Sequence, residues 1–313
     1  MNQFILTTGA AGFVGKAFCE QAVCRGLDVK GALRTKRVIP SCIEPFVVGE
    51  INGLTDWGCA LRKVNVVVHL AARVHVTQDT EDDPLAAFRA VNVEGTLNLA
   101  HQAAAAGVKR FVFISSVKVN GDTTSPRKPF TEVDAPNPQD AYGQSKLEAE
   151  QGLHQLIADT GMEVVIIRPP LVYGLGVKAN FAALLRAVQR GLPLPLGAVY
   201  NQRSFVALDN LVDFIFTCIT HPRAANQTFL VSDGHDLSTT ELLRCMAQVA
   251  GVHARLLPVP VWALQAGASL LGKGDAVQRL CGNLQVDMLK AHSLLGWVPP
   301  VSVKEGLRRA IVV

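Results

Sequence analysis

Tyr142 and Lys146 stand four residues apart in a segment, residues 139–160, whose pattern predicts a long helix. That spacing places both side chains on one helical face, one turn apart. A phenol with an ordinary pKa of about 10 transfers protons poorly near neutral pH, but a neighbouring ammonium stabilises the phenolate and lowers that pKa. The pair predicts acid–base chemistry at Tyr142, although a Tyr-x-x-x-Lys pair also occurs by chance on ordinary helix surfaces.

Two serines, Ser115 and Ser116, follow an apolar run, residues 111–114, that begins directly after Arg110. The run predicts a strand, and ligands of parallel sheets bind beyond the carboxyl ends of the strands. A hydroxyl at this position can hydrogen-bond an oxygen that gains or loses carbonyl character. The alternative is a pair of ordinary turn serines.

A glycine-rich turn, Gly9-x-x-Gly12-x-x-Gly15, joins a predicted first strand to a predicted helix that includes Phe13 and Val14. Gly9 permits the tight turn, Gly12 lets the backbone approach a pyrophosphate, and Gly15 lets helix and strand pack closely. The helix N-terminus offers free N–H groups and a positive dipole end to phosphates. This context favours dinucleotide binding over a plain tight turn.

The predicted second strand ends at Arg34, with Lys36 and Arg37 close behind it. An acid at this position would hydrogen-bond the adenosine ribose of NAD, and the segment contains none. The guanidinium of Arg34 suits the 2′-phosphate of NADP. A solvated basic loop that binds no ligand explains these residues equally well. We therefore favour NADP as the cofactor without excluding NAD.

These residues need a scaffold, and short apolar runs alternate with helical stretches in the first half of the chain. The alternation predicts an α/β fold with a Rossmann-type, doubly wound parallel sheet over residues 1–168. From residue 169 prolines cluster and strands become brief, which predicts a smaller C-terminal substrate-binding domain, residues 169–313. The two are interleaved, because residues 203–221 are expected to return to the first domain. The predicted strands are 4–8, 29–33, 46–48, 64–70, 110–115, 164–168 and 204–207, and the helices are 13–26, 85–106, 139–160 and 209–219.

Composition narrows the function further. The chain has 313 residues, of which 49% are hydrophobic and 18% charged, so that it can bury a sizeable core. A net charge of +4 without a basic stripe, and 6% aromatic residues, argue against nucleic acid as a partner. Seven cysteines without a Cys-x-x-Cys pair predict reduced thiols, a cytoplasmic location and no metal site. The apolar stretch 259–271 is too short to span a membrane. We expect it to be a buried or substrate-covering helix rather than a membrane-surface helix.

Taken together, these motifs resemble those of the extended short-chain dehydrogenases/reductases, in the NAD-dependent epimerase/dehydratase family that acts on nucleotide sugars. The resemblance covers essentially the whole chain. Within the family, the chain is most similar to the subfamily of bacterial UDP-sugar 4-reductases and UDP-glucose 4-epimerases. The matching segments are residues 9–15, 69–72, 92–96, 115–116, 142–146, 168–174, 203–206 and 294–297.

The resemblance implies that Ser116, Tyr142 and Lys146 form the catalytic triad. Asn180 and Arg203 match positions that bind the nucleotide diphosphate of the substrate, and Ser116 is expected to contact the sugar. Arg279 is the nearest counterpart of a second diphosphate-binding arginine. Tyr142 and Lys146 are also expected to contact the cofactor. The other expected cofactor residues are Gly9, Gly12, Phe13, Val14, Gly15, Arg34, Glu50, Ile51, Leu70, Ala71, Ala72, Asn92, Ser115 and Pro169.

Three features depart from the family pattern. Asn120 replaces the usual Tyr after the catalytic serine, Leu171 replaces the usual Asn before Val-Tyr-Gly, and the second arginine has no clear counterpart. The segment 115–121 resembles that of reductases that form UDP-N-acetylquinovosamine.

We therefore favour NAD(P)H-dependent reduction of the C4 keto group of a UDP-linked 4-keto-6-deoxy-HexNAc, for surface-polysaccharide or O-antigen (lipopolysaccharide) biosynthesis. The alternative is a 4-epimerase of UDP-GlcNAc or UDP-Glc with tightly bound NAD, and a minor alternative is a non-catalytic NAD(P) sensor. Related enzymes pair two long helices with their copies, so a homodimer through residues 85–106 and 139–160 is expected.

Overall fold

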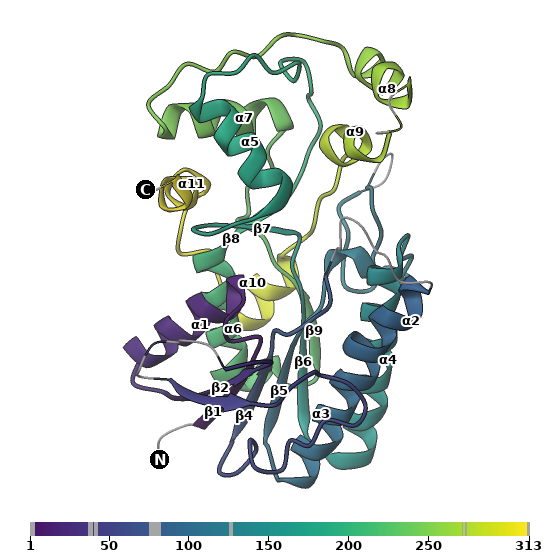
Figure 1. Ribbon diagram of the computed structural model, residues 1–313, viewed down its shortest axis with the longest axis vertical. Helices are drawn as coiled ribbons and strands as arrows, with labels where there is room; N and C mark the ends of the chain where they lie inside the picture. Colours follow the sequence, from purple (N-terminus) through teal and green to yellow (C-terminus); the bar gives the residue numbers. More distant parts are fainter. Residues whose placement is uncertain are drawn as a thin grey trace.

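A computed structural model of the chain (Figure 1) describes residues 4–36, 40, 43–74, 83–124, 128–270, 272 and 274–311. Within this part, a seven-stranded sheet has the order β3-β2-β1-β4-β5-β6-β9, and every neighbouring pair is parallel. The runs Val66–Val68 and Val164–Ile167 are almost fully buried, because helices cover both faces of the sheet. The strands are β1 (Phe4–Thr8), β2 (Asp28–Leu33), β3 (Glu44–Val47), β4 (Val66–His69), β5 (Arg110–Ile114), β6 (Glu163–Arg168) and β9 (Gln227–Leu230).

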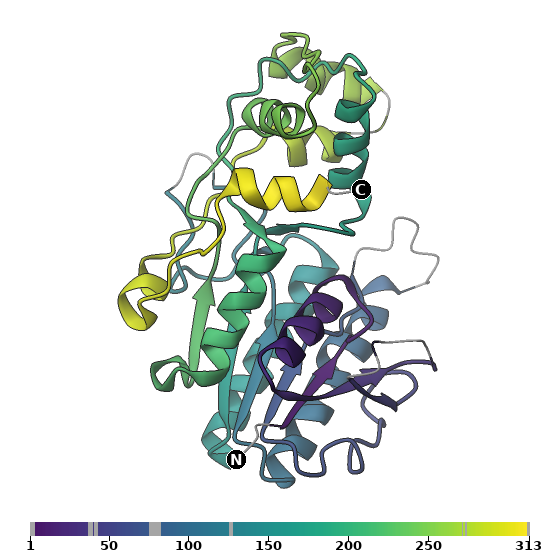
Figure 2. The same ribbon diagram turned by 90° about the vertical axis from the view of Figure 1, so that its left-hand side faces the viewer.

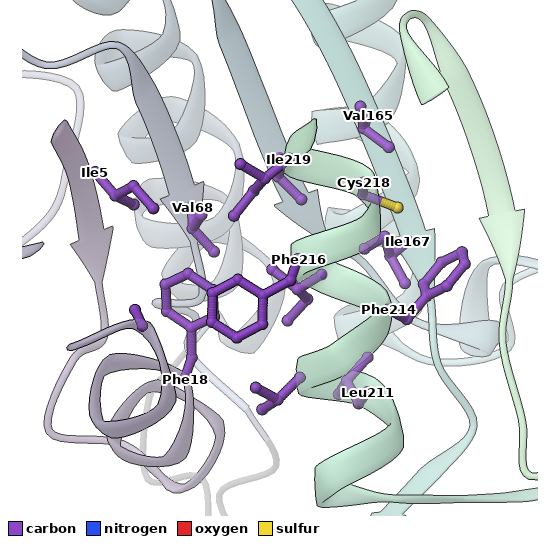
Figure 3. Close-up of a cluster of buried hydrophobic side chains, with 14 of the residues drawn as sticks. Ile5, Phe18, Val68, Val165, Ile167, Leu211, Phe214, Phe216, Cys218 and Ile219 are labelled. Atoms are coloured by element: carbon purple, nitrogen blue, oxygen red, sulfur yellow. The ribbon is translucent and has the colours of Figure 1, made fainter. Parts of the chain in front are cut away.

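One face of the sheet is covered by α1 (Phe13–Cys24) and α6 (Leu208–Thr220), which lie beside each other (Figures 1 and 2). The rings of Phe18 and Phe216 stack with their centres 4.8 Å apart between these helices (Figure 3). Helix α6 therefore belongs to the core of the sheet, although it comes from the second half of the chain.

The other face is covered by α3 (Gly95–Ala105) and α4 (Ala141–Thr160), which pack Leu99, Ala103 and Leu153 onto the sheet. The predicted helix 85–106 is present as α2 (Pro84–Arg89), a π-helical turn (Ala90–Glu94) and α3 in direct succession. A π-turn inside a helix frequently marks a functional site.

The ends of α4 follow local sequence rules. The Asp140 side chain accepts a hydrogen bond of 2.7 Å from the Gly143 N–H at the N-terminus. Gly161, with a φ of 68°, ends the helix in the left-handed conformation.

A second lobe lies beyond the carboxyl ends of the strands, since β6 leads directly into it (Figure 1). Its two parallel strands are β7 (Leu171–Tyr173) and β8 (Phe205–Ala207). A separate apolar cluster joins these strands to the helices around them, and α10 instead packs with the core of α1 and α6. The remaining helices of the described chain are α5 (Ala179–Gln189), α7 (Thr239–Val249), α8 (Val261–Leu270), α9 (Gly274–Cys281), α10 (Leu289–Leu295) and α11 (Val303–Ile311). Short 3-10 turns occupy Val117–Val119 and Pro222–Ala224.

Several features differ from the sequence-based expectations, which contained neither strand β7 nor helices α5, α7, α9, α10 and α11. Strand β9 was not predicted, because four residues after a left-handed Asn226 carry too little pattern. The stretch 259–271 does contain a helix, α8. Most of its residues are exposed, so of the two expected forms, a buried or a substrate-covering helix, the buried one is wrong. Across the described ranges, none of the helices has both the length and the apolar character required to cross a lipid bilayer.

Candidate active site

The three predicted catalytic residues meet where β5 ends against the first turns of α4. Ser116 follows β5, and Tyr142 and Lys146 lie near the start of α4. Lys146 Nζ donates a hydrogen bond of 2.8 Å to the carbonyl oxygen of Ile114, the last residue of β5. This bond holds the helix against the strand end that carries both serines.

Lys146 is a buried amine whose charge state is finely balanced. Burial lowers the pKa of Lys146 to about 7, while the carboxylate of Glu150 raises it. The ammonium nitrogen lies 4.4 Å from the ring centre of Phe113 and 6.0 Å from that of Tyr142. Near neutral pH this group can therefore gain or lose its positive charge next to the phenol.

Tyr142 is partly buried and carries its proton in the free protein. Burial raises the pKa of Tyr142 to about 12, the charge of Asp140 raises it as well, and a hydrogen bond with Ser116 opposes the shift. A positive charge beside the phenol would lower its pKa. The residue can thus donate a proton as it stands, and it can accept one when a cation stabilises the phenolate.

Asn92 lies in the π-turn and is only 1% exposed. Its Oδ1 accepts from the Arg73 N–H at 2.8 Å, and its Nδ2 donates to the Arg73 carbonyl and to Ser145 Oγ, both at 3.0 Å. Ser145 Oγ in turn donates to the carbonyl of Tyr142 at 2.8 Å. The amide of Asn92 therefore positions the loop after β4 against the helix that carries Tyr142.

The glycine turn packs too tightly for side chains. Gly9 has a φ of +65°, and a Cβ on Gly15 would lie 2.1 Å from the Gly9 carbonyl oxygen. Gly12 donates its N–H to that oxygen at 2.8 Å, and no side chain caps the α1 N-terminus among the described residues. The first turn of α1, with Phe13 and Val14, keeps its N–H groups for an anion such as a pyrophosphate, and the turn fits a dinucleotide.

A buried polar chain joins this turn to the end of β4. Thr8 Oγ1 accepts from the N–H groups of Leu70 and Ala71, each at 3.1 Å, so its own proton goes to His69 Nδ1 at 2.8 Å. His69 Nε2 then donates to Thr96 Oγ1 at 3.0 Å. Burial, with a smaller effect of Lys146, lowers the pKa of His69 to about 3, so the ring stays neutral. The sequence analysis did not predict that Thr8, His69 and Thr96 form this chain. The signal that could have indicated it is the presence of polar residues in otherwise apolar, buried elements.

A second buried network was also missed. Arg168, at the end of β6, forms three hydrogen bonds to the Glu150 carboxylate on α4 and donates from Nη1 to Asn120 Oδ1 at 3.0 Å. Asn120 Nδ2 donates to the Thr131 carbonyl at 3.0 Å. Asn120, which departs from the family pattern, thus connects the segment after Ser116 with the ion pair.

Other residues expected at the cofactor lie along the same edge of the sheet. The Pro169 carbonyl accepts from the Val117 N–H at 3.0 Å, next to Ser116. The Ser115 hydroxyl is buried and has no hydrogen-bond partner among the described residues, which suits a polar group of a ligand. Of the remaining residues, Arg34 and Glu50 are exposed, Ile51 and Ala72 are partly buried, and Arg37 lies outside the described residues.

The residues expected at the nucleotide diphosphate are more dispersed. Arg203 lies in the second lobe, where Nη1 donates to the Gly282 carbonyl at 3.1 Å. Burial lowers the pKa of Arg203, and Asp122, which follows the Ser116 segment, raises it. Arg203 is partly buried, whereas Asn180 on α5 and Arg279 on α9 are exposed.

The strand order, the glycine turn into α1 and the polar site at the strand ends define a dinucleotide-binding enzyme of the oxidoreductase type. The chain belongs to the NAD dependent epimerase/dehydratase family, whose model matches residues 5–232.

Two curated relatives and a solved structure extend this result. The chain is 49% identical over 315 residues to a UDP-glucose 4-epimerase of Vibrio cholerae, covering 99% of this chain and 94% of the relative. It is 28% identical to the N-acetyl-alpha-D-glucosaminyl-diphospho-ditrans,octacis-undecaprenol 4-epimerase of Escherichia coli O157:H7, covering 99% and 95%. The UDP-glucuronic acid 4-epimerase of Bacillus cereus, solved with NAD, has the same fold with a TM-score of 0.79 at 21% identity, covering 98% of this chain and 95% of the other.

Proposed function

We propose that the chain is a 4-epimerase of a UDP-linked sugar that works with bound NAD. The observation that carries this proposal is the 49% identity to the Vibrio cholerae UDP-glucose 4-epimerase over 99% of the chain. The Escherichia coli relative is a 4-epimerase as well. These relatives favour the alternative of the sequence analysis over the C4 reductase that it preferred.

In this proposal Tyr142 takes the proton of the sugar C4 hydroxyl and later returns it. Ser116 hydrogen-bonds the same oxygen and holds it in line with the phenol, with which Ser116 already interacts. In its protonated form, Lys146 stabilises the phenolate of Tyr142. The hydrogen bond from Lys146 to the Ile114 carbonyl fixes the position of the ammonium group. Bound NAD supplies the two-electron oxidant for C4.

The residues around the glycine turn would hold that cofactor. Gly9, Gly12 and Gly15 keep the turn close to the helix N-terminus, and the backbone of Leu70 and Ala71 is fixed beside it through Thr8. We assign the cofactor to the domain of residues 1–168, to which residues 203–221 return, and the sugar nucleotide to the interleaved domain of residues 169–313. Arg203 is proposed to pair with the sugar diphosphate, together with Asn180 and Arg279.

A homodimer is part of the proposal. The helices expected at the interface, residues 85–106 (α2, the π-turn and α3) and α4, lie on one outer side of the sheet (Figure 1). Arg89 and Glu148 form an ion pair of 2.6 Å between α2 and α4. We propose that these helices pack against their copies. Sedimentation velocity at micromolar concentration should show a dimer, and a monomer alone would contradict it.

The basic end of β2 favours a second candidate, the C4 reductase. Arg34 and Lys36 are exposed where an acid would bind the ribose of NAD. These side chains suit the 2′-phosphate of NADP, which is the reductant expected for a reductase. Affinities for NAD and NADP, measured with the wild type and with Arg34→Ser, test this point, since the substitution should weaken NADP binding selectively.

The decisive experiment offers the purified protein two substrates. One reaction contains UDP-glucose or UDP-GlcNAc without added cofactor, and formation of the C4 epimer supports the proposal. The other contains UDP-2-acetamido-2,6-dideoxy-4-ketohexose with NADH or NADPH, and nicotinamide fluorescence is followed. Stoichiometric loss of reduced cofactor, with no epimerisation in the first reaction, would overturn the epimerase in favour of the reductase.

A further inference from the structure

Helix α8 is an apolar element that the rest of the described chain leaves largely uncovered. Its sequence, Val-Trp-Ala-Leu-Gln-Ala-Gly-Ala-Ser-Leu, contains no charged residue. All ten residues are described, and Ala268 alone is buried. Trp262 is 72% exposed and Leu270 is 88% exposed. Figure 1 shows α8 at the outer edge of the second lobe, with α9 beside it.

The helix has an inner and an outer side. Val261 and Leu264 pack against the apolar cluster of the second lobe, and with Ala268 they follow the spacing of one helical face. Trp262 and Leu270 stand on other faces, away from that stripe. Leu257, which precedes the helix, is 51% exposed as well. The inner contacts anchor α8 to the lobe, and Trp262 and Leu270 remain largely exposed.

The surroundings of α8 carry positive charge. Residues 242–286 contain four basic residues, Arg244, Arg255, Lys273 and Arg279, and one acidic residue, Asp275. Arg255 is exposed just before α8, and Arg279 is exposed on α9, which packs against α8. An uncharged apolar helix within a segment that has more basic than acidic residues is complementary to an anionic lipid surface.

We propose that α8 is an interfacial helix that docks the second lobe on an anionic lipid surface. Trp262 and Leu270 enter the boundary between headgroups and acyl chains, where the indole N–H remains within reach of polar groups. Arg255 lies toward the headgroup phosphates. A ten-residue helix is about 15 Å long, so it lies in the interface and does not span the bilayer. The proposal does not depend on which sugar is bound.

The chain contains its own reporter for this contact. It has three tryptophans, and Trp57 and Trp297 are buried, so Trp262 dominates any solvent-dependent change in fluorescence. Vesicles of phosphatidylcholine with phosphatidylglycerol should shift the emission to shorter wavelength and reduce quenching by acrylamide. Vesicles of phosphatidylcholine alone, or high salt, should weaken the effect. No shift with anionic vesicles would overturn the proposal.

Variants locate the contact by co-sedimentation with the same vesicles. The double variant Trp262→Ser/Leu270→Ser should reduce vesicle binding by more than about tenfold. Arg255→Ser alone should weaken binding to the anionic vesicles in low salt and leave it unchanged in high salt. The matched control is Leu54→Ser/Val133→Ser, because these side chains are 95% and 92% exposed on the other parts of the surface. Equal binding by the control and the α8 variant would contradict the assignment.

Two other occupants of α8 give different results. If α8 covers the substrate, UDP or a UDP-sugar produces the spectral shift and anionic vesicles do not. If α8 contacts a second copy of the chain, raising the protein concentration produces the shift without vesicles. Either result would overturn the lipid proposal. Circular dichroism of each variant verifies that the fold is retained.

Discussion

Glu150 of α4 and Arg168 of β6 form a buried ion pair, with Arg168 Nε 3.0 Å from Glu150 Oε1 and Nη2 2.5 Å from Oε2. Glu150 lies one helical turn beyond Lys146, and its charge raises the pKa of that amine. A single carboxylate therefore joins the end of β6 to the helix of the proposed acid–base pair. It also counteracts the loss of charge that burial imposes on Lys146.

We expect Glu150→Gln to destabilise the protein by about 3 kcal/mol, since it leaves Arg168 buried without its counter-charge. Urea unfolding of the protein without cofactor measures this effect. Glu20→Gln on α1 is the control, because its pair with Lys16 is exposed and lies outside the proposed dimer interface. The control should cost less than about 1 kcal/mol. Equal losses in the two variants would contradict a special role for the buried pair.

We expect Tyr142→Phe to lower turnover roughly 10²- to 10⁴-fold, because the variant keeps the ring and loses the proton-transferring hydroxyl. Binding of NAD and of UDP-sugar, measured by calorimetry, should change little. Tyr200→Phe is the control, since Tyr200 is exposed in the second lobe. Turnover near that of the wild type in Tyr142→Phe would remove the phenol from the mechanism.

His69 should make the protein sensitive to acid. The pKa of His69 is about 3 in the folded protein and 6.5 ordinarily, so the unfolded chain binds more protons between these values. Stability therefore falls as pH decreases through this window, by about 1.4 kcal/mol per pH unit. Above the window His69 is neutral in both states and contributes no pH dependence.

His69→Asn tests this linkage, because the amide oxygen can replace Nδ1 as the acceptor for Thr8. Urea unfolding at about pH 7 and about pH 5 should show that the wild type loses about 2 kcal/mol more than the variant. The variant is expected to be less stable at neutral pH, since Thr96 loses its partner. An identical pH dependence in both proteins would show that another group is responsible.

The parts of the site that were predictable depend on short spacings along the chain. Tyr142 and Lys146 meet because four residues make one helical turn, and Gly9, Gly12 and Gly15 have meaning within one strand–turn–helix unit. The parallel sheet was predictable for a similar reason, since the alternation of strands and helices is visible within short windows.

The remaining features depend on contacts between distant segments. Asn120 and Arg168 are 48 positions apart and meet only because β6 lies beside β5. The exposure of α8 was not predictable either, because its apolar composition suits both a buried helix and an interfacial one. What covers a helix is decided by tertiary packing, which the local pattern does not contain.

The contact between Gly15 and the Gly9 carbonyl makes the proposed cofactor turn testable without any substrate. A Cβ on Gly15 would lie 2.1 Å from that oxygen, so Gly15→Ala must displace the turn or the first turn of α1. We expect the variant to lose about 1–3 kcal/mol of stability and to bind NAD more weakly, because the helix N–H groups move away from the phosphates. Thermal unfolding with and without NAD measures both effects. Gly267→Ala, in the interior of α8 with open space around its Cβ, should instead be neutral or stabilising by up to about 1 kcal/mol. If Gly15→Ala keeps the full thermal shift on NAD addition, the glycine turn does not hold the pyrophosphate.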